Sequence, residues 1–492
     1  MERLYFFRKN DKQRKLLTGL ALFAIAFFAS LLTANNIWRT GISGTDSSVF
    51  LYIGKMITKG YIPYRDSFDH KGPLLYLINA VGYSISPQKG IWLVELGFLF
   101  GTVCCIYKIA RLCTDNIKSL IVAGICIAQL ADWFDGGNLT EEYAMLFIAY
   151  SLFVFLDFFQ NQKITRARLI LTGFSFMAVC FLRANMISVW VVFCLAVLCQ
   201  CIAQRRFKDL GQFLLFFLIG AAVLALPIIL WLAFHGAVGD FWESYITFNM
   251  MYTGNDGTIK NIIAGMVEFY KYPIVMLAFA SGVFVFLKDR RKLDALYVCF
   301  LAITMVMMCM SGRTYLHYAL ILIPTFAYPL ARIIESLRMD SIKRCNVALI
   351  GAAIMLILLC MGKYAYTMVK CKNYSAYETA ILDLSRTIAE NTDEGDKIIV
   401  NGNADIIYLL SDRDSYSKYS YQSPIGRISG EITESYYRDV KAKGAKIIVL
   451  RGDAENYEEM KELTENLGYV KIAGQNMGSN AESDCFYIYK LN

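Results

Sequence analysis

The chain has 492 residues, of which 56% are hydrophobic and only 18% are charged, and its mean hydropathy is +0.42. A soluble globular protein of this length carries more charge and fewer apolar runs, so the composition excludes that class and predicts a helical protein that crosses a membrane many times. The net charge of +8 does not indicate a nucleic-acid partner, because the Lys and Arg side chains gather in short links between apolar runs.

The apolar runs begin at residue 16 and recur to residue 363. Six Lys or Arg residues precede the first run, which predicts a cytoplasmic N-terminus. The first run is long and no small-residue cleavage motif follows it, so we expect a permanent anchor. The later basic links are also expected in the cytoplasm. The predicted spans, about eleven in all, are 16–34, 90–110, 118–134, 142–159, 168–183, 186–204, 211–234, 262–287, 293–310, 315–334 and 345–363.

One apolar segment, residues 73–85, has only 13 residues and is too short to span comfortably. If it crossed, every later basic link would lie outside, against the usual distribution of positive charge. We therefore expect a helix at the outer membrane surface, within a long external segment that follows the first span. An odd number of spans then places the C-terminus outside.

Residues 366–492 have the pattern of a small soluble α/β domain, expected on the outer side of the membrane. Short β-branched runs at 397–402, 446–451, 469–474 and 485–491 alternate with helical segments near 404–410, 431–443 and 455–467. The predicted organisation is therefore an all-α polytopic membrane domain at 1–365 and an extracytoplasmic α/β domain at 366–492.

Asp46 is the first acidic residue after the first span, within Ser43-Gly44-Thr45-Asp46. An ionisable group against a bilayer is costly and often belongs to a working site. Its carboxylate could accept a proton from an acceptor hydroxyl or coordinate a divalent metal. It could equally cap a surface helix that begins at SSVFLYIGKMI. The local sequence leaves both roles open.

The densest polar cluster beside any apolar run is Arg65-Asp66-Ser67-Phe68-Asp69-His70-Lys71. Asp66 and Asp69 are three residues apart, so in a turn both carboxylates could face one point and hold a metal or a sugar. His70 and Lys71 could meet a phosphate. The alternative is a solvated loop of mutually paired charges. We favour the functional interpretation because the cluster lies between two apolar segments at the membrane surface.

A second acidic group runs from Asp132 to Glu142, with four acids and no base in eleven residues. Unpaired acids at the mouth of a membrane domain suggest a metal, a sugar or a cationic partner, and Glu141 and Glu142 are the candidates. The two glutamates also follow Thr140 at the start of an expected helix, where acids suit the helix dipole. Both roles can hold together.

Basic candidates occur later in the chain. Arg313 and His317 precede the span 315–334 from outside, and their spacing of four would place them on one helical face. An Arg at an outer mouth can grip a phosphate with two hydrogen bonds. Arg183, at an outer turn, is a further candidate. The alternative for this group is anchoring at the membrane interface by Arg and Tyr.

Four motifs carry a family resemblance: GTDSSVFLYIGKMITKGYIPY (44–64), DSFDHKGPLLYLINAVGYS (66–84), GGNLTEEY (136–143) and GRTYLHYALILIP (312–324). With the order of the spans, they resemble the GT-C superfamily of membrane glycosyltransferases. The branch they are most similar to is the bacterial one of protein O-mannosyltransferases and the lipid A aminoarabinose transferase. Relatives often have a paired acid beside the first Asp, whereas Ser47 and Ser48 follow here.

The resemblance implies a glycosyltransferase that moves a sugar from a polyprenyl-phosphate donor to a cell-envelope acceptor outside the plasma membrane. It implies Asp46 as the catalytic base, with His70, Lys71, Arg313, His317 or Arg183 at the phosphate. Asp66, Asp69, Glu141 and Glu142 would hold a metal, Mg or Mn, or the sugar. The alternatives are a transporter or flippase of polyprenyl-linked glycans and a polysaccharide polymerase or ligase. Most spans are apolar through their centres and the charges lie outside, which favours the transferase.

Overall fold

The computed structural model describes residues 2–38, 42–254, 258–336, 362, 366, 375–420, 425–476 and 485–491. The chain divides into two compact units. The first comprises Met1–Thr33, Glu95–Ile229 and Thr253–Thr367, and the second comprises Ala34–Val94, Leu230–Tyr252 and Met368–Asn492. The predicted division into a membrane domain at 1–365 and an α/β domain at 366–492 stays a prediction.

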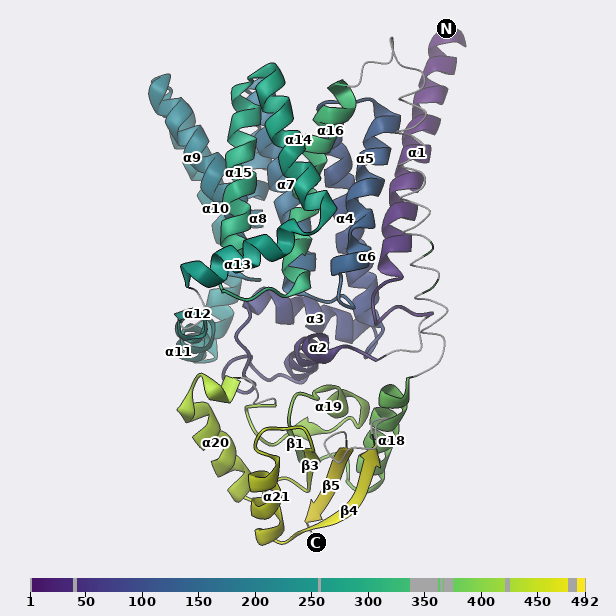
Figure 1. The fold of residues 1–492 in the computed structure, drawn as a ribbon, viewed down its shortest axis with the longest axis vertical. Helices are drawn as coiled ribbons and strands as arrows, with labels where there is room; N and C mark the ends of the chain where they lie inside the picture. Colours follow the sequence, from purple (N-terminus) through teal and green to yellow (C-terminus); the bar gives the residue numbers. More distant parts are fainter. Residues whose placement is uncertain are drawn as a thin grey trace. The chain divides into compact units, whose positions relative to one another are not determined.

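Most helices of the first unit run side by side as a bundle, and α13 lies across its neighbours (Figure 1). Its α-helices are α1 (Glu2–Ser30), α4 (Gly90–Arg111), α5 (Asn116–Ala128), α6 (Leu130–Trp133), α7 (Thr140–Asn161), α8 (Arg166–Cys180), α9 (Ser188–Ala203), α10 (Phe207–Phe234), α13 (Ile259–Tyr270), α14 (Pro273–Asp289), α15 (Lys292–Cys309) and α16 (Ala327–Ser336). Short 3-10 helices are η1 (Ala184–Met186), η3 (Leu316–Leu322) and η4 (Pro324–Phe326). Helices α4 and α10 each continue into the second unit.

Within the described residues, five helical segments are long and apolar enough to cross a membrane: Gly90–Arg111, Thr140–Asn161, Phe207–Phe234, Lys292–Cys309 and Leu316–Glu335. The protein is therefore a multi-pass membrane protein. The predicted span at 16–34 corresponds to the 29-residue helix α1, and the other predicted spans correspond to shorter or interrupted helices. Apart from residue 362, the one at 345–363 lies outside the described residues.

The predicted span at 262–287 is not a single continuous helix. The segment forms two helices, α13 and α14, bent by 94° at their junction. The break lies at Lys271-Tyr272-Pro273, and Pro273 occupies the first turn of α14. Proline lacks the N–H that would continue the preceding helix but fits the first turn of a new one. Glu268 and Lys271 interrupt the apolar run just before Pro273, a signal that the prediction of one span did not use.

Helices α8 and α10 cross very closely. A Cβ atom added to Gly173 would lie 1.9 Å from the carbonyl oxygen of Phe217, and one added to Gly220 would lie 1.9 Å from that of Ile170. Small residues let membrane helices approach until their backbones touch, where dispersion contacts replace the hydrophobic effect as the source of packing. This reciprocal pair of glycines fixes where the two helices cross.

The second unit contains two crossing helices, α2 (Thr45–Thr58) and α3 (Pro73–Ile85). The helix predicted at 73–85 is confirmed, with Pro73 in its first turn. The helices meet at Gly54, where an added Cβ would lie 2.6 Å from the carbonyl carbon of Asn79. The short elements α11 (Val238–Phe241), η2 (Trp242–Thr247, π-helical) and the first part of α12 (Phe248–Gly254) belong to the same unit.

The C-terminal part of this unit is an α/β fold with a five-stranded sheet in the order β2-β1-β3-β5-β4. Its strands are β1 (Lys397–Asn401), β2 (Asp414–Ser415), β3 (Ile447–Arg451), β4 (Tyr469–Asn476) and β5 (Cys485–Leu491). Strands β1, β2 and β3 are parallel, whereas β5 pairs antiparallel with β3 and β4. All four predicted strands are confirmed, and the two-residue β2 was missed.

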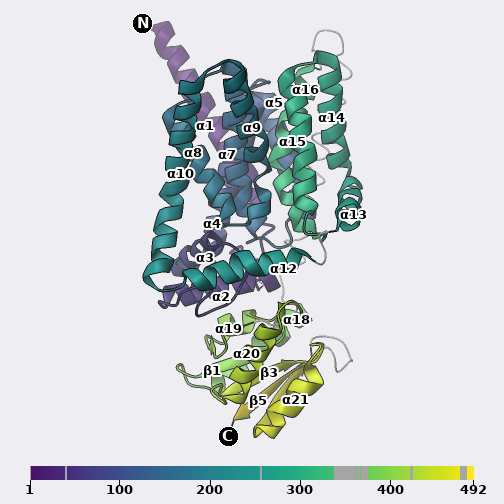
Figure 2. The same ribbon diagram turned by 90° about the vertical axis from the view of Figure 1, so that its left-hand side faces the viewer.

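Helices cover both faces of this sheet: α20 (Gly430–Lys441) and α21 (Tyr457–Asn466) on one side, α18 (Ala376–Glu390) and α19 (Ile406–Leu410) on the other (Figures 1 and 2). The three helices predicted here are confirmed. Helix α18 was not predicted, although Ser375 and Glu378 form a capping box at its start. The buried core between sheet and helices includes Ile399, Ile448, Leu450, Tyr436 and Met460.

Candidate active site

Asp46 lies in the first turn of α2, and its side chain is exposed. The N-cap of this helix is Gly44, and no side chain caps it. Asp46 is therefore not the N-cap residue, which was one of the two roles that the sequence left open. Within the described part of the chain, no hydrogen bond or ion pair engages its carboxylate. An exposed carboxylate without a structural partner is available for chemistry.

Asp66 has a structural role in the turn after α2. Its Oδ2 atom accepts a hydrogen bond of 2.7 Å from the backbone N–H of Ile62, and the guanidinium of Arg65 binds both oxygens at 2.8 Å. The hydrogen bonds from Arg65 lower the pKa of Asp66 below its usual value. These contacts close the turn around Tyr64, a buried side chain in the left-handed region at φ 69°. A bulky residue there is strained and needs such support.

The side chains of Asp69, His70 and Lys71 contact one another in series. Asp69 is 2% exposed and accepts hydrogen bonds from the Tyr76 hydroxyl at 2.8 Å and from the backbone N–H of His70 at 2.7 Å. His70 Nδ1 lies 3.3 Å from the same carboxylate, and His70 Nε2 lies 2.7 Å from Lys71 Nζ. Because an ammonium only donates, Nε2 is the acceptor and Nδ1 carries the proton. Asp69 thus orients His70, and His70 orients the Lys71 ammonium.

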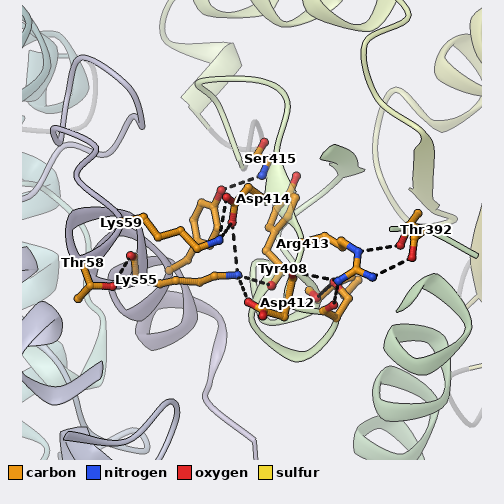
Figure 3. Close-up of polar contacts among 12 residues, drawn as sticks. Lys55, Thr58, Lys59, Thr392, Tyr408, Asp412, Arg413, Asp414 and Ser415 are labelled. Carbon is orange, nitrogen blue, oxygen red and sulfur yellow. Dashed lines mark hydrogen bonds and ion pairs between the residues drawn. The ribbon is translucent and has the colours of Figure 1, made fainter. Parts of the chain in front are cut away.

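The far end of α2 is held by ion pairs to the α/β fold (Figure 3). Lys55 is fully buried, and its Nζ lies 2.7 Å from Asp412 Oδ1 and 3.4 Å from Asp414 Oδ1. Lys59 binds Asp414 at 2.8 Å, and the Tyr52 hydroxyl accepts a 2.8 Å hydrogen bond from the backbone N–H of Ser415. These contacts fix the helix that carries Asp46.

In the first unit, the loop between α6 and α7 has an unusual backbone. Four consecutive residues, Asp135, Gly136, Gly137 and Asn138, have φ values of 46°, 85°, 82° and 56°. The two glycines and Asn138 are residue types that tolerate this region. Gly137 has no alternative, because an added Cβ would lie 2.4 Å from Glu95 Oε1. The strained loop turns Asp135 towards His317, whose Nδ1 lies 3.4 Å from Asp135 Oδ2.

The contact with His317 lowers the pKa of Asp135, through a hydrogen bond and opposite charge. The His317 ring also stacks on the Tyr315 ring, with centroids 5.6 Å apart. Two contacts therefore hold the imidazole beside Asp135.

Glu141 and Arg183 form a buried ion pair beside this loop. Arg183 Nη1 lies 2.5 Å from Glu141 Oε1, and the Thr140 hydroxyl donates to Glu141 Oε2 at 2.7 Å. The guanidinium also lies over the Tyr318 ring, 3.9 Å from its centroid. The side chain of Glu141 is only 3% exposed and that of Arg183 is 19% exposed. Each charge is thus compensated by the other.

Glu142 is fully buried, and its Oε2 atom accepts a 2.8 Å hydrogen bond from the backbone N–H of Asn138. Beside it lies Glu95 of α4, also fully buried. Two like charges are costly at such a place. Sequence reasoning missed Glu95. A single acid inside an apolar run was the available signal.

The comparisons with known proteins add the family. A model described as the competence-induced protein Ccs4 N-terminal domain matches residues 8–348. The chain belongs to this family. The match covers the segments that carry Asp46, Asp69, Glu141, Arg183 and His317. Comparison with curated protein sequences gives no match.

Solved structures share the fold. ArnT from Cupriavidus metallidurans bound to undecaprenyl phosphate matches with a TM-score of 0.63 and 12% identity, over 96% of this chain and 97% of that chain. The archaeal oligosaccharyltransferase AglB from Archaeoglobus fulgidus, in complex with an inhibitory peptide and a dolichol-phosphate, matches with a TM-score of 0.52 and 12% identity, over 97% and 74%. Both have the GT-C fold, so the predicted GT-C resemblance is confirmed.

A structure of the Archaeoglobus fulgidus oligosaccharyltransferase with Zn and sulfate also matches, with a TM-score of 0.50 and 14% identity over 92% and 72%. In the described residues of this chain, no three His, Cys, Asp or Glu side chains lie together as a metal site requires. The oxygens of Asp66, Asp69 and Glu141 already accept hydrogen bonds from protein groups. These residues do not fit a metal, and we derive no step through one.

The predicted shared helical face of Arg313 and His317 is wrong. Gly312, at φ 68°, ends the turn after α15, and the next three residues form no helix. The 3-10 helix η3 starts only at Leu316, so His317 lies in its first turn and Arg313 precedes it. A glycine in the left-handed region commonly terminates a helix. Arg313 is half-buried in this extended segment.

Proposed function

We propose that this protein is an integral membrane glycosyltransferase that moves a hexose or pentose from a polyprenyl-phosphate donor to a cell-envelope acceptor. The observation that carries the proposal is Asp46, an exposed carboxylate without a structural partner among the described residues, in a chain with the GT-C fold. The acceptor would be a glycan, a lipid or a protein at the outer face of the plasma membrane. The N-terminus would lie in the cytoplasm and the α/β fold outside.

The reaction needs a base. In our proposal, Asp46 takes the proton of the acceptor hydroxyl as its oxygen forms a bond to the anomeric carbon of the donor. The bond between that carbon and the phosphate oxygen breaks, and polyprenyl phosphate leaves. The anomeric carbon passes through a state with oxocarbenium character, as in other sugar transfers. Asp46 would not need to bind the donor for this role.

The leaving phosphate needs positive charge. We assign this role first to Lys71. Its ammonium is oriented by His70, which is in turn oriented by Asp69. A preorganised cation stabilises charge that develops on a leaving group without a reorganisation cost during the reaction. Arg313 and His317 are further candidates for donor contacts. Arg183 and Glu141 compensate one another, so we propose that they support the loop at 135–138 rather than bind the phosphate.

The donor class is supported by what the neighbours hold. The ArnT structure contains undecaprenyl phosphate, and the AglB structure contains a dolichol-phosphate. Both are polyprenyl phosphates that carry one phosphate group. The same chemistry in this chain would fit one cation at the position of Lys71. Asp66, Asp69 and Glu142 would then support the site rather than bind the sugar directly.

A transporter or flippase of polyprenyl-linked glycans is the second candidate. The 94° bend between α13 and α14 and the proline within α10, Pro227, favour it, because transporters place discontinuous helices around their substrates. A transporter has no need of an exposed carboxylate that acts as a base. A polymerase or ligase would be an enzyme with a glycan-lipid donor and would share the requirement for Asp46.

A transfer assay separates these functions. Purified protein in detergent is incubated with radiolabelled polyprenyl-phosphate sugars and cell-envelope acceptors, and the label in the acceptor is measured. We expect transfer with at least one donor. Because the acids of the candidate site do not fit a metal, we expect the same rate in EDTA, and loss of transfer in EDTA would restore the prediction of Mg or Mn. Absence of transfer, together with movement of the lipid-linked glycan across proteoliposomes, would replace the transferase with the flippase.

A further inference from the structure

The α/β fold has a topological switch point between β1 and β3. The chain leaves β1 for β2 on one side, whereas β3, the parallel neighbour on the other side, continues towards β4. In open α/β sheets, ligands bind outside the carboxyl ends of the strands at such a point. Here β1 ends at Asn401 and β3 ends at Arg451, so the residues that follow both strands meet at one edge.

Two carboxamides are locked together at this edge. Asn401 Nδ2 donates to Asn456 Oδ1 at 3.0 Å, and the Tyr436 hydroxyl donates to Asn401 Oδ1 at 3.2 Å. Asn456 Nδ2 lies 3.3 Å from the Tyr437 hydroxyl. Asn401 is 1% exposed and packs beneath Asn456 and Tyr437, which are half-buried. A buried polar network of this kind is rigid when its members are satisfied.

The backbone beside the network packs closely against the Arg451 side chain. Gly402 has φ 120°, a conformation that other residues rarely adopt, and an added Cβ would lie 3.1 Å from Arg451 Cβ. The next residue, Asn403, has a buried side-chain oxygen with no hydrogen-bond partner among the described residues. A buried acceptor left unsatisfied costs free energy, and Asn403 as a whole is only half-buried at this edge.

The charges at this edge cancel one another. Arg451 binds Asp453 through Nε at 2.5 Å and through Nη2 at 2.7 Å, and the neighbouring Arg427 binds Glu455 at 2.7 Å. Neither arginine is therefore set to receive a phosphate. Tyr377 lies near Arg451 and Asp453 and is 37% exposed, so it offers an aromatic face beside the polar groups.

We propose that the carboxyl ends of β1 and β3 form a binding site for a neutral sugar chain, through Asn403, Asn456, Tyr437 and the Arg451–Asp453 pair. Amides and hydroxyls both donate and accept, as each sugar hydroxyl does. The aromatic face of Tyr377 suits the apolar side of a pyranose ring. The further statement that this sugar chain is the acceptor rests on the proposed function.

The test is direct binding to the full-length protein in detergent. Saturation-transfer NMR is recorded with neutral oligosaccharides of two to four units built from hexose, 6-deoxyhexose and N-acetylhexosamine, with inorganic phosphate as the anionic probe. The variants are Asn403→Ala and Asp453→Ala. The control is Asn391→Ala, at the end of α18, outside the network. Thermal unfolding of each variant checks that it is folded.

We expect at least one oligosaccharide to bind, and each of the two variants to weaken it about tenfold, as the loss of one good hydrogen bond predicts. The control should bind as the wild type does, and phosphate should not compete. Binding unaffected by both variants, competition by phosphate, or no oligosaccharide binding would each overturn the site. Because donor-dependent transfer is measured separately, sugar binding without transfer would refute the proposed function and leave the site standing.

Discussion

The two ends of α2 carry charge in opposite ways. At its start, Asp46 is exposed and engages no described residue, whereas near its end Lys55 is fully buried between Asp412 and Asp414. Both side chains belong to one helix of 14 residues, so they share the same local backbone. The engaged charge fixes the helix, and the unengaged charge is the one that can change its protonation during a reaction.

The same contrast separates the other predicted site residues. Asp66, Asp69 and Glu141 are acids whose oxygens are occupied by protein donors, and they define loop geometry. An acid that already accepts hydrogen bonds at both oxygens is a poor base, because those bonds favour its charged form. Substitutions at the two kinds of position should therefore affect different measurements.

The largest effect is expected for Asp46→Asn. A positioned general base contributes about 10²–10⁴-fold to a rate. We expect transfer to fall by that factor while thermal unfolding in detergent is unchanged. The control is Glu431→Gln, an exposed acid in the first turn of α20, which should keep the wild-type rate. Full activity of Asp46→Asn would remove Asp46 from the reaction.

Arg183→Met should lower the free energy of unfolding more than the substitution of any exposed residue. It leaves Glu141 buried without its partner, which costs about 3–5 kcal/mol for a buried ion pair. Glu141→Gln should cost less, because its amide is neutral. The double variant should recover part of the loss, and unfolding temperatures of the three variants give the coupling. Equal stability of Arg183→Met and the wild type would show that the pair does not compensate the charge.

Gly54→Ala tests the crossing of α2 and α3. The added methyl group meets the backbone of Asn79 at 2.6 Å, and overpacking of this kind costs about 1–3 kcal/mol. Gly44→Ala is the matched control at the start of the same helix, since an added Cβ there has nothing within 4 Å. We expect a lower unfolding temperature and slower transfer only for Gly54→Ala. Similar results for both variants would show that the crossing is tolerant.

The smallest effect is expected for Asp412→Asn. The hydrogen bond from Lys55 lowers the pKa of Asp412, so its contribution to stability is present above its unfolded pKa, about 4, and is lost as the pH falls through its folded pKa. The side chain is 72% exposed, which limits the effect to about 1 kcal/mol or less. Unfolding measured between pH 7 and pH 3 should depend less on pH in the variant. An unchanged profile would show that the ion pair is not linked to stability.

Local patterns predicted much of the fold. The β-branched runs KIIVNG and KIIVLR became β1 and β3, and the 13-residue apolar segment became α3. The bend at Tyr272-Pro273 was missed because the prediction joined two apolar stretches across Glu268, Lys271 and Pro273. The short strand β2 was missed because pairing with β1, rather than its own residues, makes it a strand.

The site was predictable where chemistry depends on neighbours in the sequence. Asp69, His70 and Lys71 are consecutive in the sequence, and in the structure their side chains contact one another in series. The pairs Lys55–Asp412 and Glu141–Arg183 join residues far apart in the sequence, so no local pattern could reveal them. A buried lysine inside the apolar stretch of α2 requires an acidic partner, but the sequence could not name which one.

The most direct test of Asp46 as the base separates binding from chemistry. The affinity for the polyprenyl-phosphate sugar is measured for the wild type and Asp46→Asn, and each is then loaded with labelled donor and mixed with acceptor for a single turnover. The account predicts equal donor affinity and a rate of sugar transfer at least about 100-fold lower in the variant. Loss of donor affinity, or an unchanged single-turnover rate, would contradict it.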